Sequence, residues 1–450
     1  LYYIIIKIKS LLILKKIFFI MRVEMKKYSV AIIGCGSRGR DAYGKIFYSE
    51  TDKWRITALC DTNNEQLLRT ATECCVTPEN CFLTEEEFFL KKRADVLVIA
   101  TQDRDHVRMC CVALELGYDV LLEKPISPVK EELAELLCAQ KKFNRKIVVC
   151  HVLRYAPAFL KIKQVLDRGE IGKLVCIEAL EQVGYWHYSH SFVRGNWRKE
   201  SETSPMILSK CCHDLDLLQY FAGSRCQDVY SVGGITYFKK DNQPKDAADR
   251  CFECKYKNEC IYSAERLYIE RWKKFGSPKD CWPFNVVDIH VPNTEEQLRA
   301  AYKNGPYGQC VFACDNDVTD HQTVTMHFEN NVVATLTMTG FTDKLGRRMM
   351  FHGTHGQIEL NETEEKLIIT RFGKDEIVID TTKLVEDLGE DSFGHGGGDV
   401  MIIRALYNVL SQDESAVSSL EESLESHFMA LAAEKSRKNG KEVCLKDIRD

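Results

Sequence analysis

The chain has 450 residues, of which 45% are hydrophobic and 28% charged, and its formal net charge is −5 at pH 7. This composition is typical of a globular protein with roughly two or three hydrophobic cores, and it lacks the basic excess of a nucleic-acid-binding protein. The 20 cysteines include adjacent pairs inside predicted helices, so we expect reduced cysteines in a cytoplasmic protein, not a disulfide framework.

Residues 1–25 form a distinct N-terminal extension. Lysines at 7, 9, 15 and 16 interrupt its apolar run, which argues against a membrane span and a signal peptide. Almost all of its first residues can be encoded by A/T-only codons. We therefore interpret the extension as translated upstream DNA, with the native start at Met21 or Met25. An amphipathic surface helix is the alternative.

Apolar strands alternate with helices from Tyr28 to about residue 152. Strands are expected at 28–33, 54–61, 94–101, 119–125 and 146–152. This alternation is typical of a parallel sheet covered by helices on both faces. The prediction is an α/β Rossmann dinucleotide-binding domain over residues 26–150.

The pattern changes after this domain. A helix at 157–169 leads into a strand at 173–183, and alternating strands follow between 323 and 380. We predict an α+β substrate-binding domain over residues 151–450, with a large, mostly antiparallel open-faced sheet. Residues 239–300 are irregular and cysteine-rich, which indicates an insertion. A long helix at 415–439 precedes Gly440, a favoured helix-ending residue.

A glycine motif, G-x-G-x-x-G at Gly34, Gly36 and Gly39, lies between the first strand and the first helix. In this context the glycines allow a tight turn, backbone approach to a pyrophosphate, and close helix–strand packing. Ser37 and Arg38 stand inside the motif and are candidate cofactor contacts. Together these residues predict a nucleotide site.

Asp61 ends the second strand at the position suited to binding ribose hydroxyls. Its carboxylate would repel a 2′-phosphate, so NAD is favoured over NADP, although Arg38 leaves NADP open. Thr101, Gln102 and His106 lie at the carboxyl end of the strand at 94–101, at the edge where ligands bind in parallel sheets. They are further cofactor candidates, and a structural role for His106 is equally favoured.

At Glu123-Lys124-Pro125 the sequence resembles the Gfo/Idh/MocA oxidoreductases, from about residue 27 to the end. The glycine motif, the acidic end of strand two and a histidine-bearing helix match in order. The resemblance implies NAD as cofactor, a homo-oligomer, and a catalytic Lys124 beside the nicotinamide and the reacting carbinol, with Glu123 in the cofactor site. It also implies a cis Lys124–Pro125 bond.

The stretch 207–218 is expected to be the histidine-bearing helix. Cys211, Cys212 and His213 fan over about 200° on a helix, so they cannot share one metal ion, and the cysteines are expected to pack in the core. By resemblance His213 is catalytic. The family's usual Asp four residues earlier is Ser209 here. We therefore expect His213 to interact with Asp214 or Asp216 instead, or Lys210 to share in the proton transfer.

Substrate contacts are expected in two places. "HVLRYAP" resembles a family stretch that would direct Arg154 and Tyr155 into the cleft. The loop 184–198 is rich in aromatic and charged residues that suit a sugar, and an interdomain packing loop is the alternative. Its candidates are Trp186, His187, His190, Arg194, Trp197 and Arg198, with Lys210 beyond it. Second-tier candidates are Tyr307, Asp317, His321, His395 and Asp399.

Cys251, Cys254 and Cys260 form C-x2-C-x5-C, a spacing that can hold a structural zinc if a fourth ligand is present. Cys281 is the nearest choice. Reduced cysteines in an ordered loop are the alternative.

The leading hypothesis is an NAD-dependent oxidoreductase that transfers a hydride between nicotinamide and a hydroxyl-bearing carbon of a sugar, sugar derivative or cyclitol. One alternative is a redox-neutral, NAD-dependent enzyme that cleaves a glycoside on the same scaffold. Another is a non-enzymatic NAD-binding sugar sensor. No nucleic-acid or membrane partner is expected.

Overall fold

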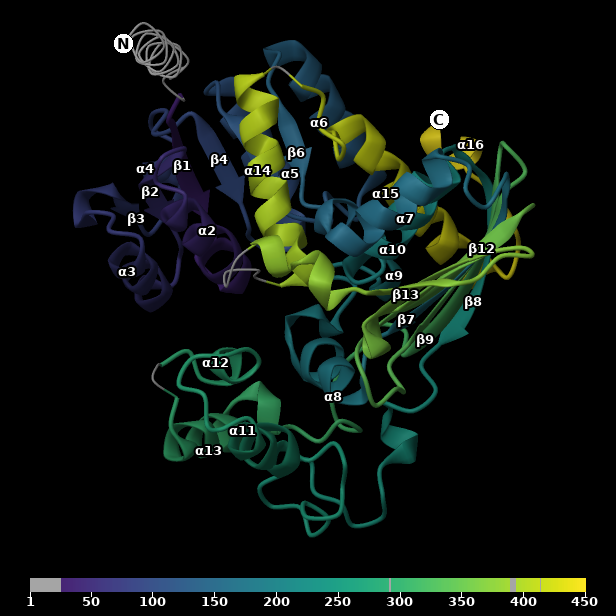
Figure 1. Ribbon diagram of the computed structural model, residues 1–450. Coiled ribbons are helices and arrows are strands. Elements are labelled where there is room, and N and C mark those ends of the chain that lie inside the picture. Colours follow the sequence, from purple (N-terminus) through teal and green to yellow (C-terminus); the bar gives the residue numbers. More distant parts are fainter. Residues whose placement is uncertain (1–25, 291–292, 389–393, 413) are drawn as a thin grey trace, which may run out of the picture.

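The computed structural model describes residues 26–290, 293–388, 394–412 and 414–450 (Figure 1). The predicted N-terminal extension lies outside the described residues. Among the described helices, none is long and apolar enough to cross a membrane. All twenty cysteines are free.

The first sheet has six parallel strands in the order β3-β2-β1-β4-β5-β6. They are β1 (Tyr28–Ile33), β2 (Trp54–Cys60), β3 (Cys81–Phe82), β4 (Val96–Ile99), β5 (Asp119–Leu122) and β6 (Ile147–Val149). Every residue of β4 is buried, as expected for a strand with helices on both faces. The predicted Rossmann sheet is confirmed. The sequence did not reveal β3, because two residues give no period.

Helices from both ends of the chain cover this sheet. They are η1 (Ser37–Gly44), α2 (Lys45–Ser49), α3 (Asn64–Glu73), α4 (Glu85–Phe88), α5 (His106–Glu115), α6 (Lys130–Phe143), α14 (Gly398–Ser411) and α15 (Leu420–Asn439). Val400 and Ile403 of α14 share one core with Val30 of β1 and Val96 of β4, and Figure 1 shows α14 beside this sheet. The C-terminal segment therefore forms part of the Rossmann layer, although the predicted Rossmann domain ended at residue 150.

The second sheet has nine strands in the order β14-β13-β12-β11-β7-β10-β9-β8-β15, and only β7 and β10 pair in parallel. The strands are β7 (Leu174–Gln182), β8 (Cys226–Gly234), β9 (His321–Phe328), β10 (Val333–Thr339), β11 (Gly346–Gly353), β12 (Gly356–Asn361), β13 (Lys366–Arg371), β14 (Ile377–Asp380) and β15 (Val443–Cys444). One face packs on α7 (Pro157–Asp167), α10 (Cys212–Ala222) and α15. The predicted mostly antiparallel, open-faced sheet is confirmed.

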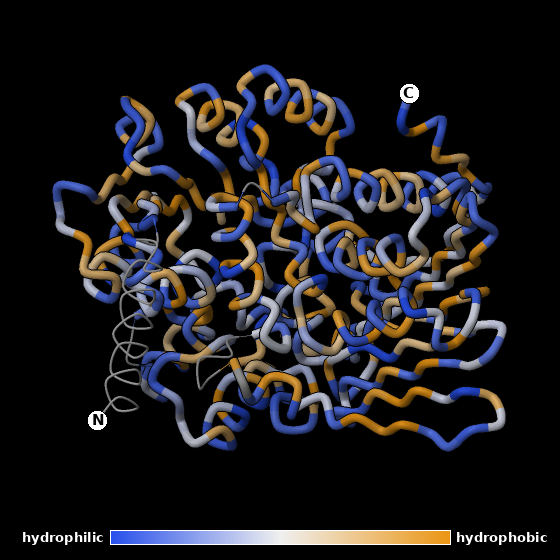
Figure 2. The backbone as a smooth tube through the Cα atoms, turned by 45° about the horizontal axis from the view of Figure 1, so that its top comes forward, coloured by the Kyte–Doolittle hydropathy of each residue, from blue (hydrophilic) through white to orange (hydrophobic). Residues whose placement is uncertain are grey.

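Hydrophobic and hydrophilic segments alternate along the chain. In Figure 2, hydrophobic segments run along strands and the helices that face them, whereas many connecting loops are hydrophilic. On the open face of the second sheet, Val175, Tyr230 and Val232 remain about half exposed (48%, 45% and 50%).

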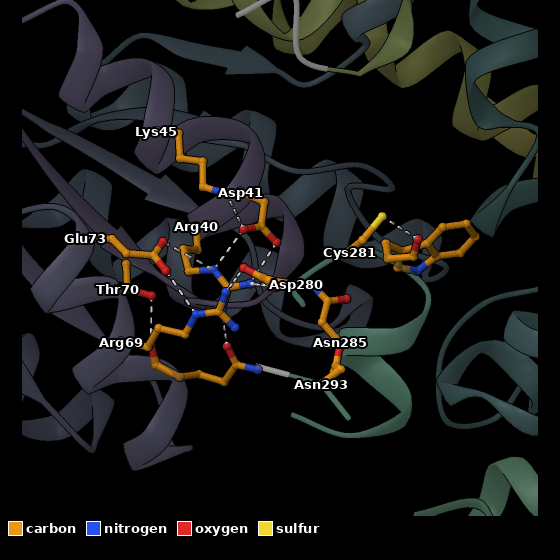
Figure 3. Close-up of polar contacts among 12 residues, drawn as sticks. Arg40, Asp41, Lys45, Arg69, Thr70, Glu73, Asp280, Cys281, Asn285 and Asn293 are labelled. Atoms are coloured by element: carbon orange, nitrogen blue, oxygen red, sulfur yellow. Dashed lines mark hydrogen bonds and ion pairs between the residues drawn. The ribbon is translucent and has the colours of Figure 1, made fainter. Parts of the chain in front are cut away.

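The segment between β8 and β9 contains the predicted irregular insertion, with α11 (Arg271–Lys274), α12 (Phe284–Val287) and α13 (Glu295–Asn304). A small core of its own holds Leu267, Tyr268, Trp272, Phe284, Leu298 and Tyr302. Asp280 pairs with Arg69 and Arg40 of the Rossmann layer, as Figure 3 shows, and His290 lies 3.3 Å from Glu65. The insertion therefore bridges the two halves of the molecule.

Candidate active site

The three glycines of the motif differ in what surrounds them. A Cβ at Gly34 (φ +89°) would lie 2.3 Å from the carbonyl oxygen of Ala100, and one at Gly39 would lie 1.8 Å from the carbonyl oxygen of Gly34. At Gly36 a Cβ would meet nothing within 4 Å. Gly34 and Gly39 are therefore required by packing, and Gly36 leaves open space beside the backbone, with Ser37 exposed at the start of η1. This arrangement fits a pyrophosphate.

A cavity of about 500 Å³ opens at the carboxyl ends of β1, β2 and β4. Asp61 lies at its rim and is held by the backbone N–H groups of Cys35 (2.6 Å) and Asn63 (2.7 Å). The carboxylate keeps lone pairs for ribose hydroxyls. Thr101 and Gln102 line the same cavity, as the sequence predicted.

The turn after β5 contains Lys124 and is supported by the buried side chain of His106. The Lys124–Pro125 bond is cis, as the resemblance implied. His106 is 1% exposed, with Nδ1 2.7 Å from the carbonyl oxygen of Pro125 and Nε2 3.3 Å from that of Thr101. The contacts of His106 therefore favour the positioning role over the cofactor contact, the two alternatives that the sequence left open, since His106 does not line the cofactor cavity.

Arg38 extends from η1 to the same turn. Its Nε donates to Glu123 (2.6 Å), its Nη2 donates to Asp399 (2.8 Å), and its guanidinium lies 4.7 Å from the ring centre of Tyr43. Burial raises the pKa of Glu123, but the charges of Arg38 and Lys124 outweigh it and hold that pKa below its ordinary value. Arg38 is thus committed to two carboxylates, which weakens the expectation that it receives a 2′-phosphate.

The predicted helix around His213 is two helices, α9 (Met206–Ser209) and α10, with a break at residues 210–211. Next to this break, the Nζ of Lys124 donates to the carbonyl oxygen of Ser209 at 2.9 Å. The hydroxyl of Ser209 is buried without a partner. Cys211 and Cys212 are fully buried in the core, where burial raises the pKa of each thiol. The prediction that both cysteines pack in the core is confirmed.

Neither neighbouring aspartate supports His213. The carboxylate of Asp214 accepts a hydrogen bond from the Nε of Arg347 at 2.7 Å. The carboxylate of Asp216 accepts one from the Nε of Arg154, also at 2.7 Å. The Nδ1 of His213 is buried without a partner, and burial, followed by the charge of Lys124, lowers the pKa of this histidine well below 6.5. His213 is therefore a neutral imidazole at neutral pH.

A second group of charged side chains surrounds Glu181 of β7, near the start of α10. Lys210 pairs with Glu181 at 3.2 Å, and Arg347 also reaches Glu181 at 3.1 Å. Burial raises the pKa of Asp214 to about 7, although Arg347 opposes the shift. Lys210 is therefore engaged by a carboxylate and not directed at His213.

Four histidines form a row through the site. Ring centres are 6.1 Å apart between His427 and His151, 6.1 Å between His151 and His213, and 5.8 Å between His213 and His395. His395 in turn contacts Asp399 at 3.1 Å. Two second-tier candidates of the sequence, His395 and Asp399, are thus brought to the site.

The other second-tier candidates lie elsewhere. Tyr307 stacks on His190 at 4.7 Å in the insertion core. Asp317 accepts from the backbone of Glu200 and pairs with Lys199, and His321 pairs with Asp320.

Aromatic side chains from the insertion complete the predicted substrate loop. Trp282 lies 5.3 Å from Trp186 and 4.9 Å from His187, and the guanidinium of Arg271 lies 3.8 Å from Trp186. Burial and then Lys210 lower the pKa of His187 well below 6.5. Sequence reasoning missed Trp282 and Arg271, because they come from a segment with no regular period.

Several predicted substrate contacts are instead structural. Arg154 is 1% exposed and makes two bonds to Asp216, so no guanidinium face is free for a ligand. Tyr155 is buried against Ser418, and Arg194 is 2% exposed and donates to backbone carbonyls. Arg198 pairs with Asp315 at the surface. Trp197, 36% exposed, lies beside it in the chain. The predicted cleft roles of Arg154, Tyr155 and Arg194 are therefore corrected.

The three cysteines of the C-x2-C-x5-C motif lie near Cys310 and not near Cys281. Cys251, Cys254 and Cys260 line a small cavity with Cys310, whereas the thiol of Cys281 donates to the carbonyl oxygen of Trp282 at 3.3 Å (Figure 3). Within the described ranges, no group of three or more His, Cys, Asp or Glu side chains is placed to hold a metal ion. The zinc prediction is not confirmed, and the structure does not place Cys281 with the other three cysteines.

Comparison with protein families decides the identity of the fold. The model described as "Oxidoreductase family, NAD-binding Rossmann fold" matches residues 28–151, and "Oxidoreductase family, C-terminal alpha/beta domain" matches residues 163–445. The chain belongs to the Gfo/Idh/MocA oxidoreductase family. An NAD-binding Rossmann domain and an oxidoreductase scaffold are thereby established for this chain.

Individual Gfo/Idh/MocA relatives are distant. The YteT protein of Bacillus subtilis is 24% identical over 393 residues, or 84% of this chain and 88% of that protein. Inositol 2-dehydrogenase of Corynebacterium glutamicum is 24% identical, over 45% of this chain and 57% of the enzyme. The 2,7-anhydro-N-acetylneuraminate hydratase of Mediterraneibacter gnavus is 24% identical, over 47% of this chain and 53% of the enzyme.

Solved structures share the fold. A levoglucosan dehydrogenase in complex with NADH and levoglucosan has a TM-score of 0.69 at 16% identity, covering 93% of this chain and 100% of that chain. An oxidoreductase domain protein from Kribbella flavida has a TM-score of 0.70 at 15% identity, covering 94% and 100%.

Proposed function

We propose that this protein transfers a hydride between NAD and a hydroxyl-bearing carbon of a sugar, sugar derivative or cyclitol. The observation that carries the proposal is the convergence of Lys124 and His213 at the carboxyl edge of the Rossmann sheet. Lys124 is fixed to the break before α10, and its charge acts on the His213 ring. A cation and a neutral imidazole side by side can bind and polarise one hydroxyl group.

The residues present fit NAD. Gly34 and Gly36 would admit the pyrophosphate, Asp61 would bind the ribose hydroxyls, and Thr101 and Gln102 would line the cavity toward the nicotinamide. When bound, NAD supplies a hydride acceptor at the nicotinamide. The fixed carboxylate of Asp61 would repel a 2′-phosphate, so we expect NAD over NADP.

Lys124 has the geometry of an oxygen-binding group. Its ammonium donates one hydrogen bond to the carbonyl oxygen of Ser209, which leaves two N–H groups for other acceptors. A negative oxygen developing on the substrate would be stabilised there. Loss of this charge should slow turnover more than it weakens NAD binding.

The substrate class is inferred from the aromatic surface and the relatives. Trp186, His187 and Trp282 form one aromatic cluster in which Trp282 is 36% exposed, and apolar sugar faces bind well to such rings. Relatives named for inositol and levoglucosan act on cyclic polyols or anhydrosugars. The homo-oligomer implied by resemblance stays a prediction, which light scattering of the purified protein tests.

The experiment is a panel of free sugars, cyclitols, anhydrosugars and glycosides, offered with NAD and followed by NADH absorbance and by product analysis. We expect NADH to accumulate with at least one cyclic polyol. No NADH and no product with any member would contradict the proposal.

A redox-neutral reaction is the second candidate. It is favoured by the missing carboxylate at Ser209 and by the relative named as an anhydro-sugar hydratase. In this case the same panel should give cleavage or hydration products while total NADH stays constant.

A further inference from the structure

His395 is the one histidine of the row that makes a hydrogen bond to a carboxylate, whereas His151 lies 3.7 Å from Asp216 without one. The Nδ1 of His395 lies 3.1 Å from Asp399, four residues later in the chain. This contact requires a proton on Nδ1, which leaves Nε2 as the basic nitrogen. His213, its neighbour at 5.8 Å, has no such partner.

Asp399 is built to remain ionised. Its side chain is 1% exposed and also accepts two bonds from Arg38, at 2.8 Å and 3.1 Å. Burial raises its pKa, but Arg38 and His395 more than reverse this and hold the pKa well below its usual range. A carboxylate that stays charged can orient an imidazole and stabilise its protonated form.

The backbone around His395 is held in an uncommon conformation. Gly394, His395, Gly396 and Gly397 have consecutive positive φ values of 39°, 50°, 59° and 86°. A Cβ at Gly394 would lie 2.7 Å from Oδ2 of Asp399, so the loop lies against the carboxylate. A non-glycine residue in this region is strained, and such residues cluster at functional sites.

The His395 side chain is also accessible. It is 35% exposed, whereas His213, His151 and His427 are 5%, 0% and 0% exposed. Its open side lines a cavity of about 210 Å³ together with Glu362, Thr381 and Thr382. These side chains offer hydrogen bonds to the hydroxyl groups of a carbohydrate.

We propose that His395 is the catalytic base and acid that exchanges the hydroxyl proton of the substrate, with Asp399 as its positioning residue. The inference rests on the proposed hydride transfer. On oxidation, the carbinol C–H bond breaks and its hydride reduces NAD⁺ to NADH, the O–H bond breaks, and its proton goes to Nε2 of His395. A C=O bond forms in the product. Reduction returns the proton from His395.

His213 and Lys124 then bind the reacting oxygen without taking its proton. This division of roles accounts for Ser209: a neutral His213 needs no carboxylate behind it, because Asp399 supplies one to His395 instead.

The charges that face His395 determine its pH behaviour. They are Asp399 on its own segment, His213 on α10, Arg38 of η1 through the shared carboxylate, and Glu362 and Glu365 after β12. Lys124 after β5 acts on the neighbouring His213. Oxidation requires an unprotonated Nε2, so the rate of oxidation should fall as the pH is lowered.

The decisive variant is His395→Gly. Glycine suits the left-handed backbone at this position, so the fold should be kept, and it leaves a hole for added imidazole. We expect kcat for the substrate identified by the panel to fall about 10²- to 10⁴-fold, with NAD affinity within twofold. Imidazole should restore part of the rate, and the restored rate should follow the pKa of imidazole. Asp399→Asn should lower kcat and shift the pH profile.

The matched control is Asn144→Gly, which changes another left-handed residue (φ +49°) at the far end of α6. It should leave kcat and the pH profile as in the wild type. A His395→Gly protein with wild-type kcat and pH profile would overturn the role of His395 and leave the proposed function standing. A wild type that turns over no panel member overturns both.

Discussion

Replacement of Arg154 by leucine tests whether this arginine is structural, as its contacts show, or a substrate ligand, as its motif suggested. In the wild type its guanidinium donates to Asp216 at 2.7 Å and 2.8 Å, to Gln219 at 2.9 Å and to the carbonyl oxygen of Val417 at 2.9 Å. Arg154→Leu would leave Asp216 charged and unpaired in the core. Loss of one partner of a buried ion pair costs about 3–5 kcal/mol in the free energy of unfolding.

The cost should depend on pH. Burial already raises the pKa of Asp216, and Arg154 opposes that shift. Without the arginine the folded-state pKa rises further above the unfolded value. The destabilisation is then full above the folded-state pKa and shrinks as pH falls through it, because the protonated acid no longer carries a buried charge.

Urea denaturation at pH 8 and pH 5 measures this cost. We expect Arg154→Leu to unfold at lower urea than the wild type, with a smaller deficit at pH 5. The double variant Arg154→Leu/Asp216→Leu should recover part of the loss, since it buries no charge. Wild-type stability of the single variant, combined with a tenfold rise in KM, would refute the structural role.

Three further predictions concern the cofactor site and the histidine row. Gly36→Ala should keep the melting temperature and weaken NAD binding measured by fluorescence, whereas Gly39→Ala should destabilise the fold, because its Cβ would lie 1.8 Å from a carbonyl oxygen; equal stability of the two would contradict this. Asp61→Ser should lower the preference for NAD over NADP in binding titrations, and an unchanged ratio would count against the ribose contact. Burial, then His151, lowers the pKa of His427 from 6.5 to about 3, so its stabilising contribution is lost as pH falls from 6.5 toward 3. His427→Gln should therefore flatten the dependence of unfolding free energy on pH there by about 1.4 kcal/mol per unit, and an unchanged slope would show that the histidine is charged in the fold.

Local patterns were sufficient for the Rossmann half of the site. The glycine motif, Asp61 and Lys124 each come directly after a strand in the sequence. The carboxyl ends of parallel strands lie at one edge of the sheet, so these residues are expected there together. The local pattern also placed Cys211 and Cys212 in the core, although the helix is broken at residues 210–211. These features depend on neighbours close in the chain, so the sequence carries them plainly.

Features that depend on distant partners were not predictable in the same way. Arg154 and Arg194 look alike in sequence to surface or cleft arginines, and only carboxylates and carbonyls from other elements show them to be buried. The row from His427 to His395 joins four separate segments. The i, i+4 pairing of His395 with Asp399 was visible in "GHGGGD", but its place beside His213 was not.

If Lys124 and its neighbours carry out hydride transfer with NAD, single-turnover kinetics of Lys124→Met should show the loss of that step. Enzyme loaded with NAD would be mixed with the substrate from the panel, and NADH formation followed by absorbance. We expect the variant to bind NAD as the wild type does and to form NADH about 10²- to 10⁴-fold more slowly. NADH formation at the wild-type rate would contradict this expectation.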